Sequence, residues 1–259
     1  MKNLVLGTLA SLALAFNAHA ADMAVKAPMA PYVPPPTWTG FYLGFNGGWG
    51  WSNNTHATVT PFGTFTTADL VPFTLSGSNA DGAVWGGQIG YNWQVGSWVL
   101  GIEGDFDGTG ITGTRHSVFA SLADPAFTNG FTATGKVNWL ASIRGRLGYI
   151  WGPGMWYFTG GGAWEDVTVD ALFSDGFFGA SVAGSFSKTF SGFVVGGGYE
   201  WMINPNWTVR GEYLFYDFSN SNSTARSLAL PGCVPSCGVL VSETNREVNV
   251  FRLGVNYKF

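Results

Sequence analysis

The end of the chain alternates strictly between apolar and polar side chains. Residues 251–259 read FRLGVNYKF. Because neighbouring side chains in a β-strand point to opposite faces, such a segment has one apolar face and one polar face. The apolar face consists of Phe251, Leu253, Val255, Tyr257 and Phe259. This pattern predicts a closing β-strand. A soluble sheet can show it too, so the rest of the chain must distinguish a soluble protein from a membrane protein.

Composition favours a protein that meets lipid through strands. Charged residues make up 11% of the chain, against roughly 25% in soluble domains. After the N-terminal segment no stretch holds 18 apolar residues, which argues against membrane-spanning helices. Glycine accounts for 38 of the 259 residues and aromatic residues for 16%. Glycine relieves crowding in tightly curved sheets, and aromatic residues suit membrane interfaces. The net charge of −4 argues against nucleic acid as a partner.

The N-terminus has the pattern of a secretory signal peptide over residues 1–20. Lys2 precedes an apolar stretch at 4–16, and Ala18-His19-Ala20 predicts cleavage between Ala20 and Ala21. A membrane-spanning helix needs about 20 apolar residues, so an uncleaved anchor is the weaker alternative. Residues 21–38 are rich in Pro and Ala, which favours extended polyproline conformation. We interpret them as a periplasmic lead-in to the first strand, and between a lead-in with a partner and a disordered tether that has none we favour the tether.

Period-two alternation predicts eight strands. Each is about ten residues or longer, the length that a tilted membrane strand requires. The predicted strands are 39–51, 82–93, 98–107, 136–150, 155–166, 189–202, 207–219 and 246–259.

The predicted connections alternate between short and long. The short turns at 95–97, 152–154 and 203–206 are each flanked by tryptophans. The long connections, at about 52–81, 108–135, 167–188 and 220–245, are rich in Ser, Thr, Asn, Asp and Gly. Short turns at one end, long loops at the other and aromatic residues at the boundary are typical of outer-membrane barrels. The Thr- and Phe-rich stretches 58–67 and 177–186 leave open longer strands or extra hairpins.

Four segments of the chain carry a resemblance to a known family: the Pro-rich lead-in, the opening strand at 38–44, the segment IRGRLGY at 143–149 and the closing strand at 251–259. On these residues the chain resembles the alphaproteobacterial outer-membrane immunogenic proteins, a porin-like family with an OmpA-type barrel. The resemblance implies an all-β fold, an antiparallel eight-stranded transmembrane β-barrel over residues 39–259. It would have short periplasmic turns and four long extracellular loops, and would lie in the cell outer membrane.

The same resemblance implies the partners. The apolar face of the closing strand, ending in Phe259, resembles the signal that the barrel assembly machinery reads. Outer-membrane lipid and lipopolysaccharide would surround the barrel, and the long loops would meet extracellular partners that the sequence does not identify.

Eight charged residues fall on the face opposite the apolar one and are therefore predicted to line the lumen. They are Glu103, Asp105, Arg144, Arg146, Glu200, Arg210, Glu212 and Arg252. Counting residues from the flanking aromatics places Glu103 beside Arg146 and Asp105 beside Arg144, although barrel shear makes this approximate. An eight-stranded barrel is just wide enough for side chains to fill it. We therefore favour a filled lumen held by ion pairs over a narrow polar pore.

Cysteine and histidine offer no complete chemical site. Cys233 and Cys237 lie in the last long loop, where an oxidising periplasm favours a local disulfide. A metal site is the alternative, but this pair lacks the further ligands that zinc needs. The mature chain has only His56 and His116, and His116 adjoins Ser117, whose side chain would point to the other face. We expect no catalytic residues, no metal and no cofactor.

These observations predict a structural and surface-interaction protein of the outer membrane. A small porin is the alternative, and a lipid-modifying outer-membrane enzyme is a minor one.

Overall fold

The computed structural model describes residues 37–52, 56–62, 73–76, 80–120, 124–176, 179–218, 226–229, 238–244 and 246–259. The chain divides into two compact units, Met1–Pro35 and Pro36–Phe259, and the described residues all belong to the second. The predicted signal peptide, its cleavage site at Ala20–Ala21, nearly all of the lead-in and the Cys233/Cys237 pair lie outside the described residues.

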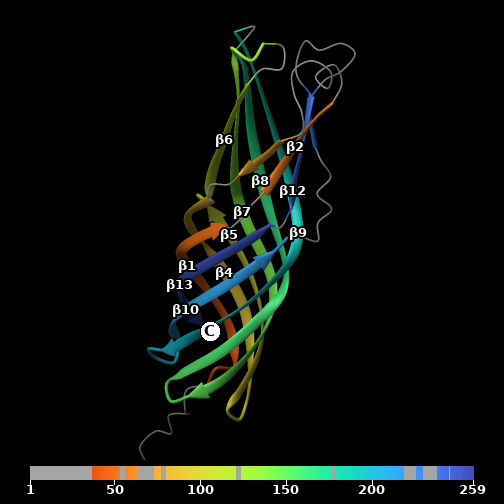
Figure 1. The fold of residues 1–259 in the computed structure, drawn as a ribbon. Coiled ribbons are helices and arrows are strands. Elements are labelled where there is room, and N and C mark those ends of the chain that lie inside the picture. The colour runs from red at the N-terminus through yellow and green to blue at the C-terminus, as the bar shows by residue number, and fades with distance from the viewer. Residues whose placement is uncertain are drawn as a thin grey trace, which may run out of the picture. The chain divides into compact units, whose positions relative to one another are not determined.

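All regular structure in the described residues is β-strand (Figure 1). No helix in this part of the chain is long and apolar enough to cross a membrane. The strands are β1 (Gly40–Ser52), β2 (His56–Phe62), β3 (Phe73–Ser76), β4 (Ala80–Val95), β5 (Trp98–Thr109), β6 (Thr112–Ala120), β7 (Thr128–Trp151), β8 (Gly154–Asp175), β9 (Ala180–Met202), β10 (Trp207–Asp217), β11 (Arg226–Ala229), β12 (Gly238–Thr244) and β13 (Glu247–Lys258).

Eight of these strands close a barrel by antiparallel pairing. The order around the ring is β1, β13, β10, β9, β8, β7, β5 and β4, and β4 pairs again with β1. The predicted fold class is therefore confirmed. Closure removes every free strand edge within the ring.

Alternation sorts the side chains between the two faces of the barrel wall. On β1, Phe45 is 76% exposed whereas its neighbour Asn46 is 8% exposed. On β13, the apolar series from Phe251 to Phe259 points outward and the intervening residues point inward. The barrel is thus apolar outside and largely polar inside, the reverse of a soluble protein. This inversion is what a lipid environment requires.

One end of the barrel, the turn end, carries the three short turns. Gly96 and Gly152 each adopt a φ of 62°, which glycine tolerates without a steric penalty. Outward-facing tryptophans flank these turns and pack against tyrosines of neighbouring strands. Ring centroids lie 5.1 Å apart for Trp98–Tyr149, 4.8 Å for Trp156–Tyr199 and 5.1 Å for Trp207–Tyr257. The turn end therefore has the aromatic belt that the sequence predicts.

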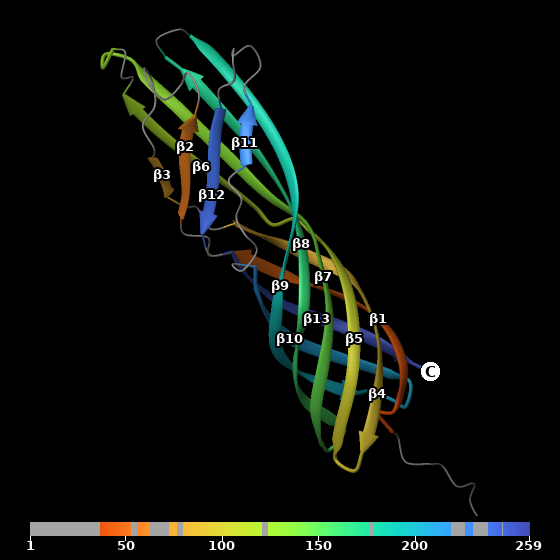
Figure 2. The same ribbon diagram turned by 90° about the vertical axis from the view of Figure 1, so that its right-hand side faces the viewer.

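Beyond the other end of the ring, the predicted long loops contain additional strands. β7, β8 and β9 continue past their predicted limits and join β6, forming a sheet that we call the extension (Figure 2). The predicted loop 167–188 alternates Val167, Val169, Ala171 and Phe173, which are buried, with exposed or half-buried neighbours. This alternation allows the β8–β9 pairing to continue through the region. The sequence prediction missed it because the region is rich in polar residues.

A separate four-stranded sheet of order β11-β12-β2-β3 comes from the first and last long connections. Cα atoms of β3 approach those of β6 within 8 Å, and those of β11 approach β9 within the same distance. The small sheet thus lies against both outer strands of the extension. The sequence left open whether the long connections contain extra hairpins. The structure shows additional strands in them, and these strands lie outside the ring.

Candidate functional site

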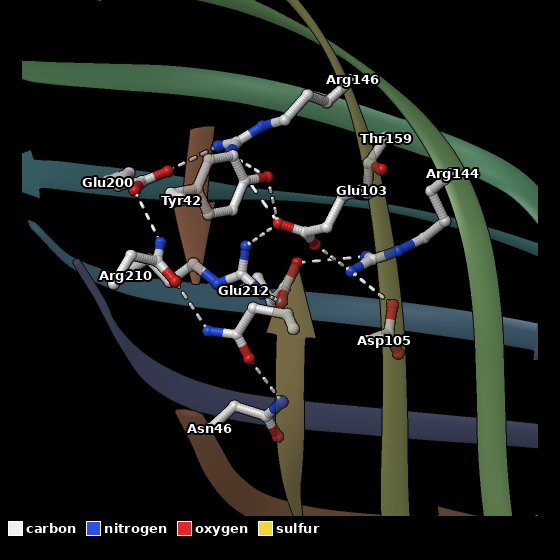
Figure 3. Close-up of polar contacts among 12 residues, drawn as sticks. Tyr42, Asn46, Glu103, Asp105, Arg144, Arg146, Thr159, Glu200, Arg210 and Glu212 are labelled. Atoms are coloured by element: carbon white, nitrogen blue, oxygen red, sulfur yellow. Dashed lines mark hydrogen bonds and ion pairs between the residues drawn. The ribbon is translucent and has the colours of Figure 1, made fainter. Parts of the chain in front are cut away.

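The lumen of the barrel holds a layer of buried charge, drawn in Figure 3. The structure places all eight predicted luminal charges here, each at most 7% exposed. Asp107, which the sequence analysis missed, joins them at 1% exposed. It shares the parity of Glu103 and Asp105 on the same strand, so the alternation already pointed to it.

Glu103 on β5 is one centre of this layer. Its carboxylate accepts from Arg144 at 2.5 Å, from the Tyr42 hydroxyl at 2.6 Å and from Arg210. Arg144 also lies 3.0 Å from a carboxylate oxygen of Asp105. The three strands β5, β7 and β10 are thereby joined through the lumen. Since β10 is not a neighbour of the other two, this link crosses the barrel.

Glu212 on β10 is the second centre. It accepts a hydrogen bond from Arg252 at 2.7 Å and one from Arg144 at 3.2 Å, and Arg210 lies 3.0 Å away. The Tyr157 hydroxyl donates to it at 3.2 Å. Three guanidinium groups therefore share one carboxylate. Such sharing suits arginine, whose planar group presents five donors in a fixed geometry.

Arg146 lies nearer the turn end, between two tyrosines. Its guanidinium carbon is 4.1 Å from the centre of the Tyr157 ring and 5.9 Å from that of Tyr42. It donates to Glu200 at 2.6 Å. A guanidinium held over aromatic faces keeps favourable electrostatic contacts where water is excluded.

The predicted pairing of Glu103 with Arg146 is wrong in register. The structure pairs Glu103 with Arg144 across β5 and β7, and leaves Arg146 3.9 Å from Glu103. The prediction counted from Trp98 and Trp151, whereas Trp98 pairs with Tyr149. No short turn joins these two strands, so the offset comes from the shear of the whole barrel. The predicted neighbours Asp105 and Arg144 do form an ion pair.

Neutral amides connect the remaining charges. Asn46 donates to Asp107 at 2.9 Å and to Gln88 at 2.8 Å, and Gln88 donates to Asn256 at 2.7 Å. Asn256 then donates to Glu200 at 2.8 Å. A chain of hydrogen bonds thus runs along the lumen from Asp107 to Glu200. The amides were placed on inward faces by the alternation, but their connections depend on the strand register.

An apolar layer closes the lumen at the turn end. Trp38, 4% exposed, packs with Val99, Met155 and Tyr157. Its backbone N–H donates to the Gln94 side chain at 2.8 Å. Trp38 precedes β1 and is the last residue of the predicted lead-in. Trp38 is therefore packed inside the barrel mouth, whereas residues 21–36 of the lead-in lie outside the described residues.

A larger apolar cluster closes the lumen on the side of the extension. It is built from inward-facing residues of the strands together with Ile111, which lies between β5 and β6, and Phe218, which follows β10. Its members are Val84, Ile111, Val137, Leu140, Ala163, Val167, Val169, Val194, Leu214, Tyr216, Phe218, Val248 and Val250. Within this region Arg246 donates to the buried Glu165 at 2.6 Å. The charged layer therefore lies between two apolar layers.

Burial makes the charged layer a cooperative unit. Taking a guanidinium or a carboxylate out of water costs several kcal/mol, on the order of the loss when one partner of a buried pair is removed (about 3–5 kcal/mol). Here each carboxylate has at least one arginine, and most have further hydrogen bonds from hydroxyl or amide groups. The side chains that fill the lumen thus stabilise one another and tie opposite walls together.

The described residues contain no group of three or more His, Cys, Asp or Glu placed to hold a metal ion. On β6, His116 is exposed and Ser117 is half-buried, as expected for neighbours that point to opposite faces. Their side chains therefore do not form a nucleophile–base pair.

The chain is similar to known outer-membrane proteins along its whole length. A family model described as outer membrane protein beta-barrel domain matches residues 8–259. The 31 kDa outer-membrane immunogenic protein of Brucella melitensis is 35% identical over 268 residues, covering 100% of both chains. The 22 kDa outer membrane protein of Rhizobium leguminosarum is 32% identical over 195 residues, covering 74% of this chain and 70% of that protein. The 25 kDa outer-membrane immunogenic protein of Brucella melitensis is 25% identical over 263 residues, covering 100% of this chain and 99% of that protein.

Proposed function

Because the chain belongs to the outer-membrane β-barrel family that these comparisons identify, we propose that it is a non-conducting barrel that anchors an extracellular β-structure. In this role the ring spans the outer membrane, and the turn end faces the periplasm. The extension and the four-stranded sheet then stand on the cell surface, where they meet partners. We propose no enzymatic activity.

The observation that carries this proposal is the layered lumen. A water-filled pore needs a continuous polar path, whereas this polar layer lies between the Trp38 layer and the larger apolar cluster. Ions entering from either side would have to cross closely packed apolar side chains. The layering supports an anchoring role over the small-porin alternative.

The extension supports a surface role. Its outward side chains on β6 include Thr112, Thr114, His116 and the apolar Val118, all exposed. Two relatives are named as immunogenic proteins of the outer membrane. For this chain we propose that the extension is the part presented to extracellular molecules. We also propose two further partners: the lipopolysaccharide that surrounds the barrel, and the barrel assembly machinery.

Conductance distinguishes the two roles. The full mature chain is refolded into a planar bilayer, and current is recorded across a range of voltages. We expect no steady open level, because both ends of the lumen are closed. Stable ohmic channels would overturn the anchoring role and place the small porin first.

Surface labelling tests the proposed orientation. In a chain with Cys233 and Cys237 replaced by serine, a single cysteine at exposed Ser181 should react with a membrane-impermeant maleimide on intact cells. A cysteine at exposed Ser97, in a turn-end loop, should react only after lysis. The reverse pattern would contradict the orientation.

A further inference from the structure

An apolar groove crosses the outer face of four neighbouring strands, β9, β10, β13 and β1. It has a volume of about 650 Å³. The strand register arranges its outward residues in two rows across the wall. The first row is Trp201, Val209, Val255 and Phe45, and the second is Tyr199, Gly211, Leu253 and Gly47.

The groove follows from a difference in height between these rows. The first row carries bulky side chains, whereas the second has glycine at two of its four positions. Leu253 leans over one of them, because its Cδ2 would lie 3.4 Å from a Cβ atom at Gly211. At Gly47 a Cβ atom would meet only the Val84 carbonyl oxygen, 3.9 Å away. Beyond the glycine row, Trp49, Phe251 and Tyr213 form the next row of large side chains.

The groove rises from the aromatic belt toward the middle of the barrel wall. It starts at Trp201, beside the turn at 203–206, and ends at Gly47, well inside β1. Three steps between strands at about 4.8 Å each give a length of roughly 14 Å. This is about half of a hydrocarbon core of about 30 Å. The groove is therefore about as long as one leaflet is thick, and because it runs across tilted strands it crosses that leaflet obliquely.

We propose that this groove holds one acyl chain of a phospholipid from the periplasmic leaflet. The groove is continuous with the lipid-facing surface, and outward apolar side chains form its walls. Its open end lies beside Tyr199 and Trp201, aromatic residues of the kind that sit at the level of lipid head groups. Extended methylene groups fit a shallow apolar channel, and filling it restores contacts that a flat bilayer would leave unmade.

Photo-crosslinking tests this proposal on the full mature chain. The protein is refolded into vesicles of phosphatidylethanolamine and phosphatidylglycerol in which a fraction of the phosphatidylethanolamine carries a diazirine in one acyl chain. After illumination, labelled peptides are mapped by mass spectrometry. We expect labelling at 199–211 and 253–255 to exceed labelling at Ile102 and Phe106, exposed outward residues of β5 that lie outside this groove.

Filling the groove should abolish the excess. Gly47→Leu places a side chain in the channel with no contact closer than 3.9 Å at its Cβ atom, and its excess labelling should fall to the level of the remaining lipid-facing surface. Gly104→Leu is the matched control: Gly104 also faces outward on open space, with the Ser142 carbonyl oxygen 3.7 Å from a built Cβ, but it lies outside the groove. Heat-dependent gel mobility verifies folding, and Val255→Trp narrows the channel from its wall should Gly47→Leu not fold.

Two results would overturn the proposal: uniform labelling around the barrel, or labelling that Gly47→Leu and Val255→Trp leave unchanged. Neither of these depends on whether the lumen conducts.

Discussion

Arg146 of β7 donates a hydrogen bond to Glu200 of β9 across the lumen at 2.6 Å, although β8 lies between their strands. The contact shows how the charged layer stabilises a closed barrel. Backbone hydrogen bonds join each strand to its two neighbours, and buried side chains join strands that are not neighbours.

Breaking this contact tests whether the lumen is dry. Within the described part of the chain, Arg146→Ala leaves Glu200 with Thr208 and Asn256 as donors. We expect it to lower the free energy of unfolding by about 3–5 kcal/mol, as for a buried pair. The double variant Arg146→Ala/Glu200→Ala should recover part of the loss because no isolated charge remains. Urea titration in lipid vesicles measures both. Single losses of about 0–1 kcal/mol without coupling, typical of solvated pairs, would instead indicate water in the lumen.

The outer face should reject charge where it meets lipid. Ile143 on β7 is 56% exposed on the outer face of the ring. Ile143→Arg should lower the free energy of unfolding by about 2–4 kcal/mol, the effect of arginine near the bilayer midplane. The control is Val118→Arg on β6, an exposed apolar residue of the extension. It should change stability by less than about 1 kcal/mol, because in the proposed orientation the extension stands outside the membrane. Equal losses would show that the membrane boundary is misplaced.

Replacing Trp38 should affect the stability of the barrel but not its conductance. Trp38→Ala removes the main side chain of the turn-end layer and should destabilise the barrel by about 3–5 kcal/mol, as for other buried aromatic residues. It should not produce steady channels, because the larger apolar cluster still closes the opposite end. Recording current from the refolded variant checks this. Open channels in Trp38→Ala would show that Trp38 alone seals the lumen.

Glycines that face the lumen should tolerate substitution less well than glycines that face outward. Gly161 of β8 faces the lumen directly opposite Arg144 on β7, and a Cβ atom there would collide with the Ile143 carbonyl oxygen. Gly161→Ala should therefore cost about 1–3 kcal/mol of stability, as overpacking does. In the matched variant Gly145→Ala the side chain points outward, and its Cβ atom would lie 4.0 Å from the Gly160 carbonyl oxygen. Unfolding titrations that rank the two variants in the opposite order would contradict the assignment of faces.

The terminal aromatic should matter for assembly. Phe259 packs against Phe41 and Tyr257 at the turn end, with ring centroids 5.7 Å and 5.0 Å apart. Phe259→Ser should lower the amount of folded barrel in the outer membrane while export continues, because it removes the end of the predicted assembly signal. The folded fraction is measured by heat-dependent gel mobility of membrane fractions. Normal levels of folded Phe259→Ser protein would show that Phe259 is not part of the signal.

Much of the barrel is predictable because its signals are local. Alternation along β13 places Leu253 outside and Arg252 inside whatever the neighbouring strands do. Tryptophans beside each short turn mark the belt in the same way. The ring of eight strands follows from these repeated local patterns.

The pairing of charges required the tertiary structure. The residues facing the lumen were predictable, but the partner of Arg146 depends on how far β7 slides against β5 and on which side chains reach across the barrel. Barrel shear sets both, and no single strand encodes it. Trp38 likewise lies before the first predicted strand, so alternation did not predict its position inside the barrel mouth.

By itself the sequence determined the eight strands of the ring, their two faces and the end that carries the aromatic belt, because side-chain direction in a strand is a local property of the backbone. The tertiary structure alone decided the register, the ion pairs of the lumen, its two apolar closures and the groove on the outer face. Each of these depends on contacts between residues far apart in the chain, which form only when the ring closes.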